Sequence, residues 1–324
     1  MSQLVDLLSQ YSGLSSYDVR KISEGAPDRY KEYPIDKKSK NTEEKRIIAQ
    51  PASEVKYLQG VLRDVMLEGL PIHRCATAYR KGVRLVDNAI PHSGTSKILK
   101  MDFRNFFNSI TSSDWRRYCE DSEILSSEDI HLTSRLLFWR KSGGRALRLS
   151  VGAPTSPILS NILMYQFDCA ISDLLAEEKV SYTRYADDLT FSAPRTGYMV
   201  DVKGYVRRAI KEIKYPSQLR INKEKTSYYT NKYRRSVTGL VLANDGRVTV
   251  GRDRKRRVFV GLYKFSRGEL DQSSAMQIAG LLSFIISVER DFLDVVYRRY
   301  GVDVVRDLQT VPWTKKQSSE GNWL

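Results

Sequence analysis

Apolar residues recur at every third or fourth position through much of the chain, a spacing that predicts amphipathic helices. These helices are expected over residues 1–25, 53–67, 128–140, 157–175 and 200–214, and again over 254–265, 272–287 and 289–299. Ser53 is placed to act as the N-cap of the second helix. Pro157 stands in the first turn of the fourth, where proline is tolerated.

Shorter apolar runs between turn residues predict strands. They are expected at 46–51, from Ile98 to Asp102, at 182–192 as a hairpin, and at 237–242 and 247–250. Asn244-Asp245-Gly246 separates the last two strands and is a strong hairpin-turn pattern. Residues 26–45 are polar and charged, which is typical of an exposed loop or hairpin tip. The pattern as a whole predicts mixed α and β structure.

The tip of the hairpin at 182–192 carries two adjacent carboxylates, Asp187 and Asp188. Aspartate is depleted in strands, and two like charges side by side repel. Carboxylates at such a tip are hard oxygen ligands for Mg²⁺, which binds to one or two carboxylates together with substrate phosphates. Paired aspartates also occur in surface turns, so the pair by itself leaves a solvated turn and a metal site both open.

A third carboxylate favours the metal site. An apolar run ends at Asp102 and leads into a turn rich in phenylalanine, so this side chain is expected to be partly desolvated. A desolvated carboxylate needs a cation or hydrogen bonds to stay ionised. If this strand lies beside the hairpin, Asp102, Asp187 and Asp188 converge. Three such groups can hold two Mg²⁺ ions about 3.5–4 Å apart, as in polymerases and nucleases.

The charge balance predicts a polyanionic partner. The 324 residues include 53 Lys and Arg against 38 Asp and Glu, a net charge of +15. Basic residues cluster at 37–40, 232–235 and 252–257, and the 19 tyrosines suit base stacking. A basic protein with no nucleic-acid partner is the alternative on charge alone.

The remaining composition excludes several classes of site. Cys75, Cys119 and Cys169 have no Cys-x-x-Cys spacing, and with three histidines they give no legible zinc site, so buried reduced thiols are expected. No apolar stretch is long enough to span a membrane, and the N-terminus lacks the order of a signal peptide. A soluble cytoplasmic protein without a membrane partner is predicted.

Four motifs follow one another between residues 40 and 240. In chain order they are Asp102 with Phe106-Phe107, Gly152-Ala-Pro-Thr-Ser-Pro157 with Asn161, Tyr185-Ala-Asp-Asp188, and Leu219-Arg-Ile-Asn-Lys-Glu-Lys-Thr226. This series resembles the catalytic motifs of reverse transcriptases. Asn88-Ala-Ile-Pro-His92 and Val237-Thr-Gly239 further resemble two elements of the bacterial retron enzymes. Taken singly, His92 also fits an ordinary loop histidine and the triplet a strand end.

The resemblance implies an α+β fold of the right-hand polymerase type, with a small antiparallel palm sheet backed by helices and a helical thumb. The expected division is 1–95 for an N-terminal helix and fingers, 96–111 for the first catalytic palm strand, 112–150 for fingers helices, 151–245 for the palm with the Tyr-Ala-Asp-Asp hairpin, 246–313 for the thumb, and 314–324 for a flexible tail.

The resemblance also implies an RNA-directed DNA polymerase with two catalytic Mg²⁺ ions, for which Mn²⁺ can substitute. Asp102, Asp187 and Asp188 correspond to the catalytic metal ligands, with the backbone carbonyl of Phe103 as a further ligand. The chain departs from the family at Val151, where glutamine is usual. A side-chain contact at this position is therefore in doubt.

Four residues correspond to nucleotide-binding positions of the family: Arg46, Phe107, Gly152 and Lys225. Arg46 would hold the triphosphate, because a guanidinium fork suits phosphate oxygens. Phe107 would exclude a ribose 2′-OH and so select dNTPs. Gly152 would lie beside the incoming nucleotide, and Lys225 near the leaving group. A surface arginine, a core phenylalanine and a solvated lysine are the alternatives for the three side chains.

By resemblance, the partners are a cognate structured noncoding RNA, its cDNA product, dNTPs, an effector or toxin protein of an anti-phage defence system, and host RNase H, which removes the template. Synthesis would start from the 2′-OH of a guanosine and give branched RNA–DNA. Candidate RNA contacts are Asn88, His92, Val237, Thr238, Gly239, Arg252, Arg254, Lys255, Arg256 and Arg257. The alternatives are a non-retron bacterial reverse transcriptase and a catalytically silent RNA-binding subunit of a toxin–antitoxin complex.

Overall fold

The computed structural model describes residues 2–36, 45–199 and 201–312, and the chain divides into two compact units. The first unit contains the residues up to 84 together with 95–230, and the second contains 85–94 together with the residues from 231 onward. The segment 85–94 thus belongs with the C-terminal unit. The basic cluster at 37–40 and the predicted tail at 314–324 lie outside the described residues, and the division into fingers, palm and thumb stays a prediction.

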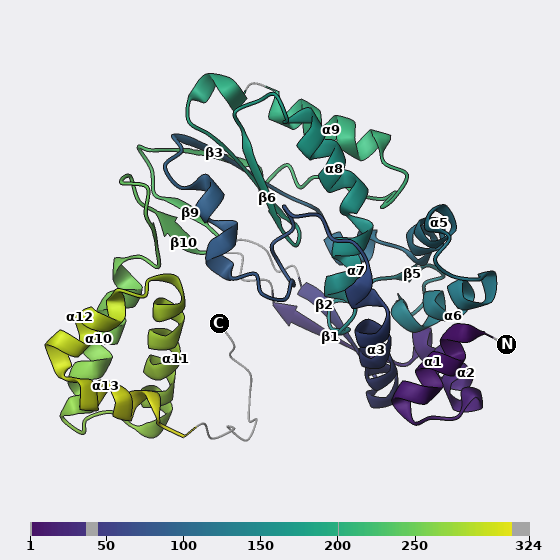
Figure 1. Ribbon diagram of the computed structural model, residues 1–324, viewed down its shortest axis with the longest axis horizontal. Helices are drawn as coiled ribbons and strands as arrows, with labels where there is room; N and C mark the ends of the chain where they lie inside the picture. The colour runs from purple at the N-terminus through teal and green to yellow at the C-terminus, as the bar shows by residue number, and fades with distance from the viewer. Residues whose placement is uncertain (1, 37–44, 200, 313–324) are drawn as a thin grey trace. The chain divides into compact units, whose positions relative to one another are not determined.

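A four-stranded antiparallel sheet, in the order β6-β7-β3-β8, organises the first unit. Its strands are β3 (Lys97–Asp102), β6 (Ser181–Tyr185), β7 (Asp188–Ala193) and β8 (Ser227–Thr230). The helices beside it are α7 (Ser156–Leu163), α8 (Tyr165–Leu174) and α9 (Val202–Glu212). Buried apolar side chains of α8 and α9 join those of β3 and β7 in one core, and Figure 1 shows these helices running along the sheet.

The rest of the first unit is mainly helical. Its helices are α1 (Gln3–Ser12), α2 (Ser16–Gly25), α3 (Ser53–Val65), α4 (Phe106–Ser109), α5 (Ser112–Ser122) and α6 (Ser127–Leu137). Two hairpins accompany them, formed by β1 (Tyr30–Asp36) with β2 (Lys45–Pro51) and by β4 (Trp139–Arg140) with β5 (Leu147–Arg148).

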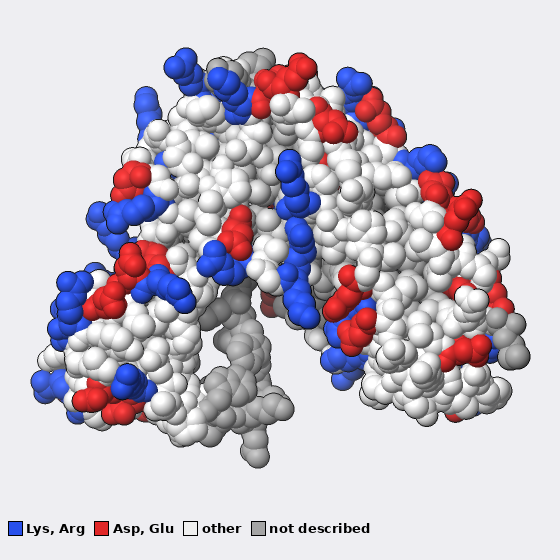
Figure 2. Space-filling view, viewed as in Figure 1, with Lys and Arg blue, Asp and Glu red and all other residues white. Residues whose placement is uncertain are grey.

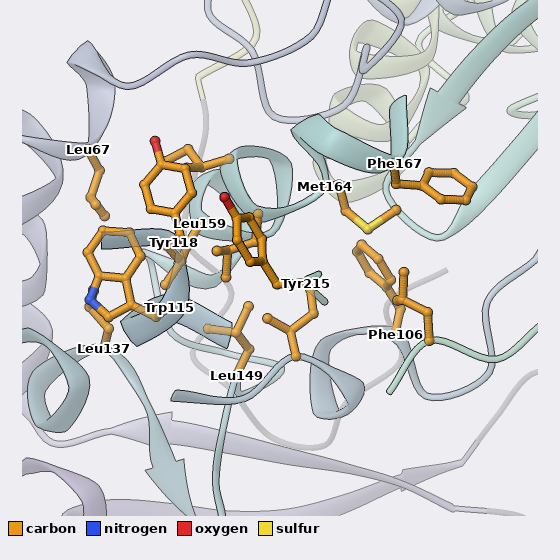
Figure 3. Close-up of a cluster of buried hydrophobic side chains, with 14 of the residues drawn as sticks. Leu67, Phe106, Trp115, Tyr118, Leu137, Leu149, Leu159, Met164, Phe167 and Tyr215 are labelled. Carbon is orange, nitrogen blue, oxygen red and sulfur yellow. The ribbon is translucent and has the colours of Figure 1, made fainter. Parts of the chain in front are cut away.

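Aromatic side chains fill much of this core (Figure 3). Trp115 stacks on Tyr118 with ring centroids 5.5 Å apart, and Tyr215 meets Tyr118 edge-on at 5.9 Å. Farther along, Phe106 stacks 5.7 Å from Phe103, the residue that follows β3. Because a close-packed interior permits little movement, this cluster fixes the end of β3.

The second unit combines a three-stranded antiparallel sheet with four helices. Its strands are β9 (Arg235–Val237), β10 (Leu240–Leu242) and β11 (Val248–Thr249), and its helices are α10 (Arg252–Ser266), α11 (Gln272–Val288), α12 (Phe292–Tyr300) and α13 (Val302–Gln309). Gly261 allows α10 and α11 to pack closely, since a Cβ atom there would lie 2.6 Å from the Ile278 side chain.

Several predicted elements are divided or shifted in the structure. The helix predicted at 1–25 is two helices, because Gly13 adopts a left-handed conformation (φ 71°) and ends α1. The helix predicted at 157–175 is likewise divided at Met164 into α7 and α8. Residues 237–242 are not one strand, since Thr238 and Gly239 form a turn.

Three smaller expectations also change. Ser53 is the first residue of α3, and Ala52 occupies the N-cap position instead. The helix predicted at 128–140 ends at Leu137, after which Trp139 and Arg140 form β4. The stretch predicted as an exposed loop or hairpin tip at 26–45 contains the strand β1, which pairs with β2 to form a hairpin.

The state of the cysteines and the length of the apolar helices were both predicted from the composition. All three cysteines are free thiols; Cys75 and Cys119 are buried, as predicted, and Cys169 is half-buried. Among the described residues, no helix is both long enough and apolar enough to cross a membrane.

Candidate active site

Three aspartates meet at one end of the four-stranded sheet. The β6–β7 turn consists of Ala186 and Asp187, and the antiparallel register places Asp102 directly opposite Asp188. The Phe103 amide donates to the Asp187 carbonyl at 3.1 Å, which fastens the turn to the end of β3. The predicted juxtaposition of the strand and the hairpin is therefore confirmed, and it brings Asp102, Asp187 and Asp188 together.

The local environment disfavours negative charge on this cluster. Asp102 is buried, Asp187 is half-buried and Asp188 is exposed. Desolvation, and after it the charge of Asp102, raises the pKa of Asp187. Desolvation by the surrounding protein, followed by the charges of Asp187 and Asp102, raises the pKa of Asp188 to about 6. Two neighbouring carboxylates with raised pKa values favour a bound cation, which would stabilise their charged forms.

One ammonium group partly balances these acids. Lys225 Nζ lies 2.9 Å from Asp102 Oδ2, while most of the Lys225 side chain is exposed. Burial lowers the pKa of Lys225, but the hydrogen bond and charge of Asp102, with Asp187 and Asp188, outweigh it and raise that pKa overall. The lysine predicted near the leaving group thus contacts a predicted metal ligand.

Arg46 and Tyr79 lie within the electrostatic reach of Asp187. Desolvation is the largest cause of the raised pKa of Asp187 and of Tyr79, and the positive charge of Arg46, exposed on β2, offsets part of each rise. Tyr79 is half-exposed with a left-handed backbone (φ 59°), and its ring lies 6.5 Å from that of Tyr185. Sequence reasoning missed Tyr79, because nothing in the sequence marks its conformation or its distance from Asp187.

Gly152 has a steric role that the structure makes explicit. Its φ is 134°, and a Cβ atom at this position would lie 2.8 Å from the Ala49 carbonyl oxygen on β2. The neighbouring Val151 carbonyl accepts a hydrogen bond from the Ala49 amide at 2.9 Å. Position 151 thus fastens the loop to β2 through its backbone, which any side chain permits. Phe107 is half-buried, whereas Phe106 is in the core.

A second cluster of ligand-type side chains is formed by His73, Cys75 and Asp168. Their ligand atoms all lie within 4.8 Å of one another, and His73 Nδ1 is 3.1 Å from Cys75 Sγ. Asp168, however, already forms a buried ion pair with Arg184 at 2.6 Å. Desolvation also raises the pKa of the Cys75 thiol, which disfavours the thiolate that a metal needs. We assign no metal to this cluster.

The two elements that resemble retron enzymes lie together in the second unit. Asn88 Nδ2 is 3.5 Å from Thr238 Oγ1, and Thr238 and Gly239 have the positive φ values (47° and 77°) that two-residue type I′ turns require. Asn88, His92 and Val237 are buried. The Asn88–Thr238 hydrogen bond supports the shape of the turn, and Thr238 and Gly239 lie nearer the surface than these three residues. Direct RNA contact by Asn88, His92 and Val237 stays a prediction.

The basic side chains of helix α10 are of two kinds: some have partners within the protein and others are exposed. Arg254 donates to the Gly239 carbonyl at 2.8 Å, and Lys255 pairs with Glu289 at 2.5 Å. Arg252, Arg256 and Arg257 are exposed. On the face in view in Figure 2, acidic side chains are interspersed with basic ones over α10, α12 and α13. RNA binding by α10 stays a prediction, and Arg252, Arg256 and Arg257 are its most exposed candidate residues.

Arg256 and Arg257 also line a groove between α10 and α11. The groove has a volume of about 500 Å³, and the apolar side chains of Val260 and Ile278 form part of its lining. Lys264 adds a third cation.

Comparison with known proteins agrees with this geometry. Residues 35–260 match the family described as Reverse transcriptase (RNA-dependent DNA polymerase), whose members generally use divalent metal ions. The Retron Ec83 reverse transcriptase of Escherichia coli is 36% identical over 285 residues, covering 86% of this chain and 89% of that protein. The Retron Ec86 reverse transcriptase of the same organism is 29% identical over 322 residues, covering 96% and 94%.

Among solved structures, telomerase from Candida albicans resembles the chain with a TM-score of 0.47 and 13% identity, covering 90% of this chain and 62% of that one. This likeness is too distant to bear on function. The family match and the level of identity to the retron enzymes are sufficient, and they confirm the predicted α+β polymerase fold. The chain belongs to the retron reverse transcriptases and is an RNA-directed DNA polymerase.

Proposed function

We propose that the chain adds deoxynucleotides by two-metal catalysis, with Asp102, Asp187 and Asp188 as the metal ligands. The observation that carries this proposal is the strand register that sets Asp102 opposite Asp188 and ties the Asp187 carbonyl to Phe103. An oxygen-only set of donors fits Mg²⁺, and Mn²⁺ accepts the same ligands. Once bound, the two ions would activate the primer hydroxyl and neutralise the triphosphate and the departing pyrophosphate.

The residues around the aspartates would position the nucleotide. Arg46 is exposed and would hold triphosphate oxygens with its guanidinium fork. Lys225 is mostly exposed, so its ammonium can leave Asp102 when a metal ion balances that charge, and then donate to the leaving group. The half-buried ring of Phe107 would block a ribose 2′-OH. Gly152 would keep the loop beside the nucleotide pressed against β2.

The template proposed for this enzyme is a cognate structured noncoding RNA, which it would copy into single-stranded DNA. Its similarity to retron enzymes supports initiation from the 2′-OH of a guanosine, which yields branched RNA–DNA. The exposed residues Arg252, Arg256 and Arg257, with the groove beside them, would contact phosphates. A role in anti-phage defence, with an effector protein as partner and host RNase H removing the template, belongs to the same proposal.

A double substitution, Asp187→Asn with Asp188→Asn, tests the metal site. DNA synthesis on the cognate RNA should fall below detection, because neutral amides cannot replace carboxylates as metal ligands. RNA affinity should stay within about twofold. Asp173→Asn on the exposed surface of α8 is a matched control and should leave both properties unchanged. Residual synthesis by the double variant would contradict the catalytic assignment, and a large loss of RNA binding would contradict a separate metal site.

A further inference from the structure

Three fully buried polar side chains lie behind the catalytic hairpin. They are Asn161 on α7, Asp168 on α8 and Arg184 on β6, each 0% exposed. Arg184 donates through Nε and Nη2 to the Asp168 carboxylate, at 2.6 Å for the closest pair, and through Nη1 to Asn161 Oδ1 at 3.0 Å. Burying an ion pair carries a desolvation penalty, and apolar residues of similar volume often do as well or better. A role beyond packing is therefore worth seeking.

Two of these side chains, Arg184 and Asn161, each donate to a backbone carbonyl. Arg184 Nη1 donates to the Ala186 carbonyl at 3.2 Å, and Asn161 Nδ2 donates to the Ala78 carbonyl at 2.8 Å. Ala186 itself (φ 56°) and Tyr79, which follows Ala78 (φ 59°), both adopt the left-handed conformation. Residues other than glycine avoid this region and keep it only where their surroundings impose it. The three buried polar side chains thus form a hydrogen-bond network that extends to the backbone at both strained positions.

Both strained positions lie close to the β6–β7 turn that carries Asp187. Ala186 precedes Asp187 in the β6–β7 turn, and the ring of Tyr79 lies 6.5 Å from that of Tyr185, the last residue of β6 before this turn. Asp187 also receives the Phe103 amide through its carbonyl. Its backbone is therefore held from the β3 side by Phe103 and, through Ala186, from the α7–α8 side by Arg184.

We propose, on the basis of the metal-binding role assigned above to Asp187, that Asp168, Arg184 and Asn161 are positioning residues that hold this aspartate in its metal-binding orientation and fix Tyr79 near it. Asp168 keeps Arg184 charged and oriented, and Tyr182 supports Asp168 with a hydrogen bond of 2.9 Å. Arg184 and Asn161 then each hold one carbonyl. Weakening this network of side-chain hydrogen bonds lets the turn at Ala186 relax toward ordinary backbone conformations, which displaces the Asp187 carboxylate.

Two variants test this role. Asn161→Ala removes the hydrogen bonds to Ala78 and Arg184, while the ion pair between Arg184 and Asp168 stays intact. Arg184→Lys keeps the positive charge but cannot reach Asp168, Asn161 and Ala186 together, because lysine has one compact ammonium in place of a planar fork. Asp114→Asn is the matched control: this carboxylate is also fully buried in the first unit, and it accepts bonds from Thr111 and Ser217.

Mn²⁺ binding, measured by electron paramagnetic resonance on the full chain, separates positioning from stability. The Asn161→Ala and Arg184→Lys variants should each bind Mn²⁺ at least fivefold more weakly. Each should also need a correspondingly higher Mg²⁺ concentration for half-maximal DNA synthesis, with kcat recovering at saturating metal. Asp114→Asn should change Mn²⁺ affinity less than twofold, even if its melting temperature falls as much as those of the Asn161→Ala and Arg184→Lys variants.

Two results would overturn the proposal. The first is unchanged Mn²⁺ affinity in whichever of the two variants folds, and the second is an equal loss of affinity in Asp114→Asn. Asp187→Asn distinguishes this failure from failure of the metal site itself. If Asp187→Asn also retains Mn²⁺ binding and synthesis, the assignment of Asp187 as a ligand is wrong. If only Asp187→Asn is defective, the metal site stands and the positioning role does not.

Discussion

Replacing Asp188 with asparagine should stabilise the metal-free protein while abolishing its DNA synthesis. In the folded chain the Asp188 carboxylate is partly desolvated and lies beside Asp187 and Asp102, which together raise its pKa from 3.8 to about 6. Asparagine has nearly the same shape without the charge. The substitution therefore removes a repulsion that the folded protein tolerates when no metal ion is bound.

The pKa of Asp188 sets the size of this effect. A rise from 3.8 to about 6 is about two units, and at ~1.36 kcal/mol per unit the ceiling is about 3 kcal/mol. Asp188 is exposed to solvent, which screens the charges and reduces the expected gain to about 1 kcal/mol. For a unit of this size, such a gain raises the melting temperature by about 2–4 °C.

The gain should depend on pH in a definite direction. An acid whose folded pKa exceeds its unfolded pKa binds more protons when folded, so the wild-type protein loses stability as the pH rises from about 4 to about 6. The advantage of Asp188→Asn should be complete at pH 7.5 and should shrink as the pH falls toward 4. Excess Mg²⁺ should reverse the order by stabilising only the wild-type protein.

Thermal unfolding followed by circular dichroism, in EDTA and then in excess Mg²⁺, measures these differences. The expected order in EDTA at pH 7.5 is Asp188→Asn above wild type. A variant that melts below the wild-type protein under these conditions would refute the account of mutual repulsion. Equal stabilisation of both proteins by Mg²⁺ would refute the account of Asp188 as a metal ligand.

Three further substitutions test separate parts of the site. Phe107→Ala should lower the preference for dNTPs over rNTPs, as a ratio of kcat/KM, at least tenfold in single-nucleotide extension; an unchanged ratio would make Phe107 a packing residue. Gly152→Ala should destabilise the fold by about 2 kcal/mol or more, seen as a lower melting temperature, because its Cβ would meet the Ala49 carbonyl at 2.8 Å. Thr238→Asn should stabilise the chain by about 1 kcal/mol, since asparagine tolerates the left-handed conformation better than threonine does; a loss of stability in the melting curve would contradict this.

The cluster of Asp102, Asp187 and Asp188 was predictable from sequence because the signals were local. An apolar run ending in Asp102 and an aromatic hairpin with acids at its tip each specify a strand with a carboxylate at its end. Antiparallel pairing of β3 with β7 then leaves little choice about where the acids meet. Gly152 was predicted for its likeness to a motif, and the structure adds a physical reason, since the Ala49 carbonyl leaves no room for a Cβ atom at this position.

The errors arose where tertiary contacts override local pattern. Met164 has no helix-breaking chemistry, yet α7 and α8 are separate helices around it. Thr238 is β-branched and favours a strand, but the β9–β10 pairing forces it into a turn. His92 carried a sequence motif, and sequence alone gave no means of seeing that its side chain is fully buried.

The buried network of Asn161, Asp168 and Arg184 could not be predicted from the sequence for a related reason. Asp168 and Arg184 are 16 residues apart on different elements, and their pairing depends on how α8 packs against β6. A charged residue on an otherwise apolar helix face is the only trace of it in the sequence. Asn161 belonged to a recognised motif, but sequence could not show that it bonds to Arg184 rather than facing the nucleotide.

The most direct test of the central claim is the chemical nature of the nucleic acid made in cells. The chain would be expressed with its flanking noncoding locus, and the copurified nucleic acid treated separately with RNase, DNase and a 2′,5′-debranching enzyme. The account predicts a DNA strand joined to RNA whose gel mobility shifts after debranching. Linear cDNA that the debranching enzyme leaves unchanged would contradict the proposed 2′-OH priming, and RNA without any DNA would contradict polymerase activity itself.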